Sequence, residues 1–251
     1  MNQYIVDTFH DETKLFEEIS SGLREMGIPA QCVLDDIISV DAKKNTSDVI
    51  ADVTGRFIID NLETDKVYEI LRLHCSGRDE IEGAAKCFKN DMFNRYSRLR
   101  VLKKELKEAL LNYGRINVEG LLNFRLHEYN HLLYTGTAMA LEDYIANKAC
   151  EDFLNLLEYY VSIQDSRYDT VIVTQTDNGY VITDENGRDI NDEDDAEFFD
   201  GMEISPLKAD DILIGRLMNI APERIIMNAD ADKPVIKTLK RIFAGRLSVA
   251  D

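Results

Sequence analysis

One stretch of the chain, residues 116–164, constrains the fold more than any other. It contains no proline, and its apolar side chains recur at intervals of three and four residues, as they do along one face of a helix. The pattern weakens at residues 135–137, where Gly136 stands between two threonines. We therefore expect two long helices, or one bent helix. The apolar residues that recur at helical intervals are Leu122, Leu126, Tyr129 and Leu133, followed by Leu141, Ile145, Phe153, Leu156, Leu157, Tyr160 and Val161.

The residues before this stretch are expected to form a small αβ piece followed by helices. Alternating and helical apolar patterns predict strands at 4–9 and 31–40 and helices at 11–26, 47–60, 66–75 and 79–113. The polar residues 43–47 indicate a hinge, and residues 61–65 are expected to separate two helices.

After residue 165 the periodicity changes from helical to alternating. An Asn178-Gly179 turn between two alternating runs predicts a β-hairpin, because these residues accept the positive φ angles of a tight turn. The expected elements are strands at 170–176, 180–183, 189–190 and 224–228 and helices at 206–220 and 234–243. The acidic residues 192–197 lack the spacing of a calcium loop and are expected to be a solvated loop.

Together these patterns predict an α+β protein. We expect a short αβ segment at residues 1–44, a predominantly helical domain at 45–165, and a small antiparallel β-hairpin αβ region at 166–251. A chain of 251 residues with 45% hydrophobic residues is long enough to bury a sizeable core in such an arrangement.

Composition disfavours several classes of protein. The net charge of -18 repels nucleic acid, whose binding depends on clustered Lys and Arg. No apolar run reaches the roughly 18 to 20 residues of a membrane span, and the first residues do not resemble a signal peptide, so we expect a cytoplasmic protein. The scattered residues Cys32, Cys75, Cys87 and Cys150 indicate reduced thiols rather than disulfides or a structural zinc site.

Basic residues gather along one predicted helix of this acidic chain. On a single helix over residues 79–113, they would lie within an arc of about 100° beside the apolar face. A solvated face, or a complement to the chain's own acidic segments, is the ordinary interpretation of such a stripe. The sharper hypothesis is a docking surface for a protein partner, or an anion-binding module, formed by Lys86, Lys89, Arg100, Lys103, Lys104 and Lys107.

The sequence also contains one match to a metalloprotease motif. His127, Glu128 and His131 fit H-E-x-x-H, in which both histidines bind zinc and the glutamate activates water, and Glu151 is spaced as a third ligand. This gives an alternative function, a zinc-dependent hydrolase. Against it, the helical wheel places both histidines opposite the apolar stripe, and no strand is expected nearby. The sequence contains no nucleophile elbow, Walker loop or dinucleotide fingerprint.

Four segments resemble the YtxC family of sporulation proteins from endospore-forming bacteria. They are INVEGLLNFRLHEY at 116–129, EDFLNLLEYYVSIQD at 151–165, VIVTQTDNGYVITDENGRDI at 171–190 and DDILIGRLMNIAPERIIMN at 210–228. The matching residues Phe124, Arg125, Leu126, Glu128 and Tyr129 have structural roles in our interpretation, and the family pattern does not require a histidine at position 127. The resemblance implies a sporulation setting but neither an activity nor functional residues.

We therefore expect a cytoplasmic, non-enzymatic interaction protein of sporulation that acts on an unidentified protein partner. No cofactor is expected, and zinc belongs only to the alternative hydrolase.

Overall fold

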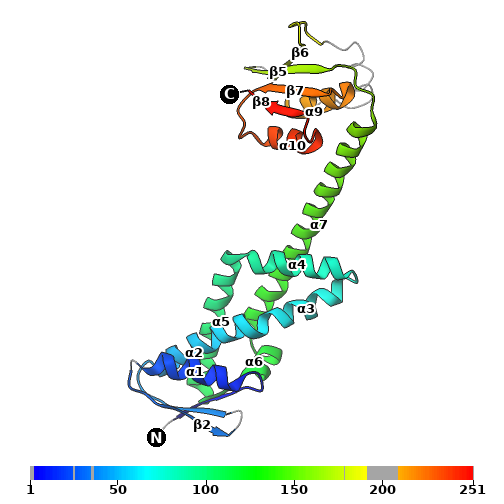
Figure 1. Ribbon diagram of the computed structural model, residues 1–251. Helices are drawn as coiled ribbons and strands as arrows, with labels where there is room; N and C mark the ends of the chain where they lie inside the picture. The colour runs from blue at the N-terminus through cyan, green and yellow to red at the C-terminus, as the bar shows by residue number, and fades with distance from the viewer. Residues whose placement is uncertain (1–2, 25, 35–36, 178, 191–208, 251) are drawn as a thin grey trace. The chain divides into compact units, whose positions relative to one another are not determined.

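A computed structural model of the chain describes residues 3–250, apart from residues 25, 35–36, 178 and 191–208 (Figure 1). The acidic loop expected at residues 192–197 thus lies outside the described residues. The chain divides into two compact units, Met1–Asn147 and Lys148–Asp251. Each unit combines a helical part with a four-stranded mixed sheet, which confirms the α+β class. The boundaries expected at residues 44 and 165 remain predictions.

The first unit begins with a sheet in the order β2-β3-β1-β4. Its strands are β1 (Gln3–Asp7), β2 (Ala30–Leu34), β3 (Ile37–Asp41) and β4 (Arg115–Asn117), of which β4 pairs parallel to β1. The single strand expected at 31–40 is wrong, since β2 and β3 form an antiparallel pair instead. The helix α1 (Glu12–Arg24) packs its buried Leu15, Ile19 and Leu23 into the core of this unit.

The helices of the first unit differ from the expected ones at two junctions. No loop separates the helices near residues 61–65, because the π-helix η1 (Ile58–Leu62) joins α2 (Thr46–Phe57) to α3 (Glu63–His74). The single helix expected at 79–113 is also wrong. It is divided into α4 (Arg78–Asn90) and α5 (Met92–Tyr113).

The side chain of Asp91 explains the division between α4 and α5. Its carboxylate accepts a hydrogen bond of 3.0 Å from the backbone N–H of Asn94, so Asp91 is the N-cap of α5. The C-terminal end of the expected helix is confirmed, since Gly114 adopts a left-handed conformation with a φ of 67° directly after Tyr113.

The long stretch that dominates the sequence forms α6 (Val118–Phe124) and α7 (His127–Ile163). A long helix is therefore confirmed, but its interruption lies at residues 125–126 and not at 135–137. Within α7 the hydroxyl of Thr137 donates a hydrogen bond of 2.7 Å to the carbonyl of Leu133. This buried hydroxyl therefore has a hydrogen-bond partner within its own helix.

The second unit contains a sheet in the order β6-β5-β7-β8. Its strands are β5 (Thr170–Thr176), β6 (Gly179–Asp184), β7 (Arg224–Asn228) and β8 (Leu247–Val249). The expected hairpin is confirmed by the antiparallel pairing of β5 with β6, although Asn178 of its turn lies outside the described residues. The third strand expected at 189–190 is reduced to one bridge between Thr183 and Asp189.

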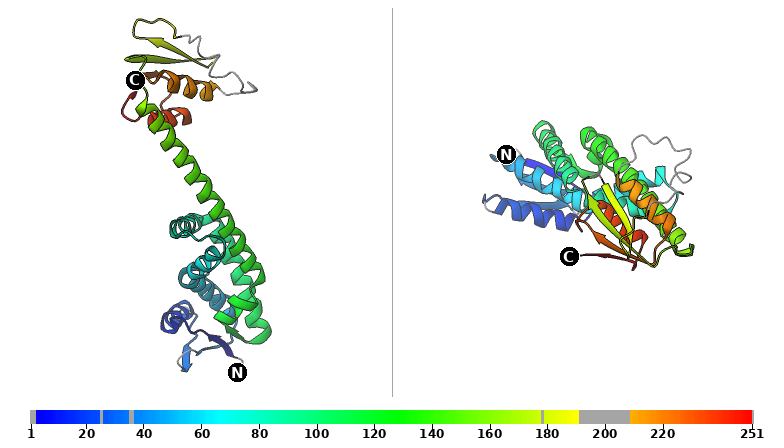
Figure 2. Two further views of the ribbon diagram at one scale, coloured as in Figure 1. Left: turned by 90° about the vertical axis from the view of Figure 1, so that its right-hand side faces the viewer. Right: turned by 90° about the horizontal axis from the view of Figure 1, so that it is seen from above.

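Two helices lie in the connections that complete this sheet, and only the connection from β7 to β8 joins parallel strands. The helix α9 (Ala209–Ile220) connects β6 to β7, and α10 (Pro234–Ile242) connects β7 to β8. Figures 1 and 2 show both helices on the same side of the sheet, and the buried residues of both belong to one core with those of the strands. Val161 of α7 is buried in the same core, so this unit also packs on the end of the long helix.

Ionisation of Tyr180 on β6 is expected to destabilise the second unit at alkaline pH. Burial raises the pKa of its hydroxyl to about 12, and a hydrogen bond of 2.9 Å to the carboxylate of Asp210 contributes to the rise. The unfolded chain releases this proton near pH 10, about two pH units earlier. The contribution of Tyr180 to stability is therefore complete below about pH 10 and is lost as the pH rises to about 12.

We expect the Tyr180→Phe variant to lose less stability than the parent between about pH 10 and about pH 12. The measurement is the free energy of unfolding of both proteins at a series of alkaline pH values. A decrease that both proteins share comes from the other tyrosines and from the lysines, so the difference between the two curves reports Tyr180. Parallel curves for the parent and the variant would contradict this expectation.

Among the described residues, no helix combines the length and the apolar character that crossing a membrane requires.

Candidate functional site

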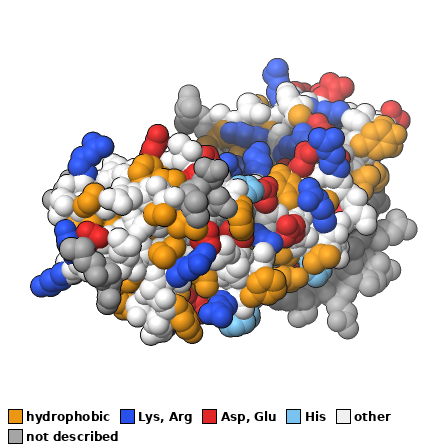
Figure 3. Space-filling view, turned by 90° about the horizontal axis from the view of Figure 1, so that it is seen from below, with side chains coloured by type: hydrophobic (Ala, Val, Ile, Leu, Met, Phe, Trp, Pro, Cys, Tyr) orange, Lys and Arg blue, Asp and Glu red, His pale blue; other side chains and the backbone are white. Residues whose placement is uncertain are grey.

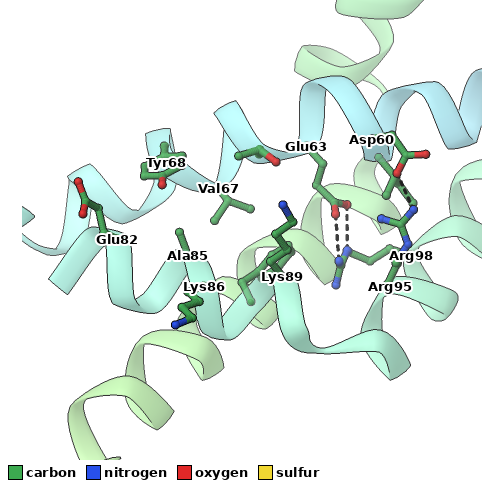
Figure 4. A pocket seen from close by; sticks show the side chains of 13 residues that line it. Asp60, Glu63, Val67, Tyr68, Glu82, Ala85, Lys86, Lys89, Arg95 and Arg98 are labelled. Atoms are coloured by element: carbon green, nitrogen blue, oxygen red, sulfur yellow. Dashed lines mark hydrogen bonds and ion pairs between the residues drawn. The ribbon is translucent and has the colours of Figure 1, made fainter. Parts of the chain in front are cut away.

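A buried side-chain network of the first unit lies beside a pocket between α3, α4 and α5 (Figure 4). The pocket has a volume of about 430 Å³. The π-helix η1 supplies Ile59 and Asp60 to its wall, so the unusual turn contributes directly to its shape. Polar and charged side chains form much of the remaining lining: Glu63, Thr64, Tyr68, Glu82, Lys86, Lys89, Arg95 and Arg98.

A buried ion pair forms one wall of this pocket. The guanidinium of Arg98 donates two hydrogen bonds of 2.9 Å to the two carboxylate oxygens of Glu63. Only 3% and 6% of the two side-chain surfaces are exposed, so water does not replace either partner. Such a bidentate pair holds both groups in one geometry. It thereby fixes α5 against the first turn of α3.

Tyr129 of α7 completes the network. Its hydroxyl donates a hydrogen bond of 2.9 Å to Glu63 Oε2. Burial raises the pKa of this hydroxyl well above its ordinary value, and the negative charge of Glu63 adds to the rise. Tyr129 is therefore a neutral donor at physiological pH, and α3, α5 and α7 share one buried polar cluster.

Phe88 and Gly136 enclose the far side of Arg98. The Arg98 guanidinium carbon lies 4.2 Å from the centre of the Phe88 ring, a cation–π distance. Arg98 Nη1 has no hydrogen-bond partner among the described residues, so this contact is the favourable interaction on that side. A Cβ atom at Gly136 would lie 3.2 Å from the Phe88 ring. The glycine therefore serves close packing of α7 and does not interrupt the helix.

The cations of the pocket fall into two groups. Arg98 pairs with Glu63, and Arg95 donates a hydrogen bond of 2.5 Å to Asp60. Lys86 and Lys89 of α4, in contrast, form no ion pair within the described parts of the chain. Figure 4 shows Lys89 extending from α4 toward α3, beside Arg98. The two lysines therefore give the pocket rim positive charge that the protein does not neutralise.

The six basic residues predicted as one docking stripe do not share one helix face. Lys86 and Lys89 lie on α4, and the break at Asp91 separates them from Arg100 and the three lysines that follow on α5. The helical wheel used to group them required a single helix, and that assumption is wrong.

On α5 the predicted lysines contact carboxylates of their own unit. Lys103 pairs with Asp52, Lys107 lies 2.5 Å from Asp48, and Lys104 lies 3.7 Å from Glu128. Arg100 is exposed. Figure 3 shows Lys and Arg side chains intermixed with Asp and Glu side chains on the face seen from below. This arrangement matches the ordinary interpretation of the stripe, a complement to the acidic α2.

Comparison with models of protein families gives a match to the YtxC-like family over residues 30–248. The chain belongs to the YtxC-like family. Neither the curated proteins nor the solved structures contain a significant match to it. Membership supports a sporulation-related role, and it covers both units because the matched residues begin at β2 and end within β8.

In this YtxC-like protein the H-E-x-x-H residues lie at the start of α7. His127, Glu128 and His131 are exposed, whereas Tyr129 and Leu133 are buried, which confirms the expected orientation of this helix. Glu151 belongs to the same continuous helix. Because a helix turns once in about 3.6 residues, twenty residues place it more than about five turns after His131.

The structure therefore does not bring the four predicted zinc residues together. No group of three His, Cys, Asp or Glu side chains within the described ranges is arranged to hold a metal ion. These residues do not fit the zinc site of the alternative hydrolase.

Two residues of the buried network, Glu63 and Arg98, were not predicted from the sequence. A signal was nevertheless present. Arg98 lies four residues before the buried Leu102, and Glu63 lies four residues before the buried Val67, so both charges occupy core-facing positions of their helices. Charged residues at core positions on two helices indicate a buried pair.

Proposed function

We propose that this protein is a non-enzymatic interaction protein of sporulation that acts in the cytoplasm. Its family supports the sporulation setting. We further propose that Lys86 and Lys89 bind an acidic group of a protein partner at the rim of the pocket. The observation that carries this proposal is the contrast between these two lysines and the lysines of α5, which their own unit neutralises.

The surroundings of the two lysines favour a local electrostatic contact. The net charge of -18 opposes any extended anionic surface such as nucleic acid. A contact between single carboxylates and these ammonium groups needs no such extended surface, since charge pairs act within a few ångströms while more distant charges are screened by salt. The buried Glu63–Arg98 pair keeps the pocket wall fixed during binding.

Affinity capture from sporulating cells tests the proposal. We expect the double variant Lys86→Glu/Lys89→Glu to recover about tenfold less of the partner than the parent protein, because two attractive contacts become repulsive. Capture by the parent should also weaken as salt is added. Quantitative mass spectrometry of the recovered proteins is the measurement.

A second double variant with the same change in net charge provides the control. Arg100→Glu/Lys237→Glu alters two exposed cations outside the pocket and should leave capture unchanged. The same proteins in the same amounts from the parent and the Lys86→Glu/Lys89→Glu variant would refute the role of the pocket rim.

A further inference from the structure

An apolar stripe lies on the part of α7 that belongs to the second unit. We define the α7 stripe as the exposed residues Ala149, Phe153, Leu156, Tyr160 and Ile163. Their exposed fractions are large for apolar side chains, 59% for Phe153 and 65% for Leu156. Within the second unit, the described residues leave about half or more of each large side chain of the stripe exposed. An exposed apolar row of this kind on a soluble surface marks an interaction site.

The spacing of the α7 stripe is that of a helix-pairing seam. Its members are separated alternately by four and three residues, the pattern of the core positions in a coiled coil. The stripe is not part of the core-facing side of the helix. Leu154, Leu157 and Val161 pack into the second unit's core from a face about 110° away. The helix thus has two separate apolar faces, and only one is buried.

We propose that the α7 stripe binds the α7 stripe of a second copy of this chain. Charge is the first argument for this occupant. In a protein with a net charge of -18, the five positions of the stripe carry no charge at all. An uncharged apolar row is complementary to itself, and a two-fold pair uses the same patch on both copies.

The residues beside the α7 stripe support pairing between like copies. In a coiled coil, charges at the neighbouring positions set the choice of partner and its orientation, and like charges there oppose pairing. Here those positions are Cys150, Asp152, Leu157 and Tyr159, of which only Asp152 is charged. In a parallel pair, the position opposite Asp152 is that of the uncharged Leu157, which is partly buried in its own copy's core, and in an antiparallel pair it is that of the uncharged Tyr159. Neither arrangement opposes like charges.

The available area is sufficient for a weak dimer. The exposed parts of the four large side chains of the stripe and of the adjacent Tyr159 amount to on the order of 500 Å² per copy. Two copies therefore bury on the order of 1,000 Å², the lower limit for a specific interface. We accordingly expect dissociation in the micromolar range.

Analytical ultracentrifugation of the full chain tests this proposal. From about 1 μM to about 200 μM, the parent protein should change from monomer to dimer. The variant Leu156→Asp/Ile163→Asp should remain monomeric over this range, because it places two charges in each copy's seam. Both positions are exposed, so far-UV circular dichroism should show an unchanged fold.

The matched control is Asn155→Asp/Ser162→Asp, which adds the same charges on α7 outside the stripe and should dimerise like the parent. A parent protein that is monomeric at every concentration overturns the proposal, as does a dimer that persists in Leu156→Asp/Ile163→Asp. A monomeric chain whose stripe binds a different protein would overturn it as well.

Discussion

Replacing Arg98 with methionine should destabilise the first unit by about 3 to 5 kcal/mol at neutral pH. Methionine resembles the arginine stem in volume, so the main effect is electrostatic. The substitution leaves the carboxylate of Glu63 buried, with the Tyr129 hydroxyl as its one remaining side-chain partner among the described residues. A buried charge without its counterion is far more costly than the intact pair is stabilising.

Hydrogen exchange followed by mass spectrometry measures this loss separately in each unit. Peptides from α3 and α5 should exchange faster in Arg98→Met, whereas those from β5 and β7 should be unchanged. The double variant Arg98→Met/Glu63→Gln is the control, since it removes both charges and keeps an acceptor for Tyr129. It should recover most of the loss. A double variant as unstable as the single one would show that the cost is steric and not electrostatic.

The elements with strong local signals were predicted correctly. The hairpin followed from two alternating runs around Asn-Gly, and α10 from Pro234 at the start of an apolar-periodic segment. The inward position of Tyr129 and the outward position of His127 followed from the helical wheel. In each case the signal is contained within one element and needs no knowledge of its neighbours.

Two errors arose where one local signal competed with another. The apolar spacing continues through Asp91, so the wheel predicted one helix, but the Asp91 side chain satisfies the N–H of Asn94 and starts a new one. Conversely, Gly136 resembles a helix breaker. Its lack of a side chain instead allows Phe88 to approach α7, a reason that exists only in the packed structure.

The candidate site was less predictable than the fold because it depends on contacts between distant residues. Glu63, Arg98 and Tyr129 come from three helices, and no sequence spacing joins them. The short strands β4 and β8 were missed for the same reason, since three residues carry little periodicity and their pairing partners are remote. The sequence located the basic residues of α5, but it did not predict that Asp48 and Asp52 would pair with two of their lysines.

The largest effect expected in the second unit comes from Phe243. This side chain is 1% exposed and belongs to the core of the second unit, which shares no buried residue with the core of the first. Phe243→Ala should cost about 3 to 5 kcal/mol, because it removes the transfer free energy of the ring and leaves a cavity. Since the two cores are separate, the loss should be confined to one unit.

Hydrogen exchange again distinguishes the units. In Phe243→Ala, peptides from β5, β7 and α10 should lose protection while peptides from α2 and α5 keep theirs. Phe153→Ala is the matched control, as it removes the same ring from a position that is 59% exposed and should change protection little. Equal losses in both units of Phe243→Ala would mean that the two cores unfold as one cooperative structure. Loss of protection in Phe153→Ala comparable to that in Phe243→Ala would contradict the assignment of Phe243, rather than Phe153, to the core.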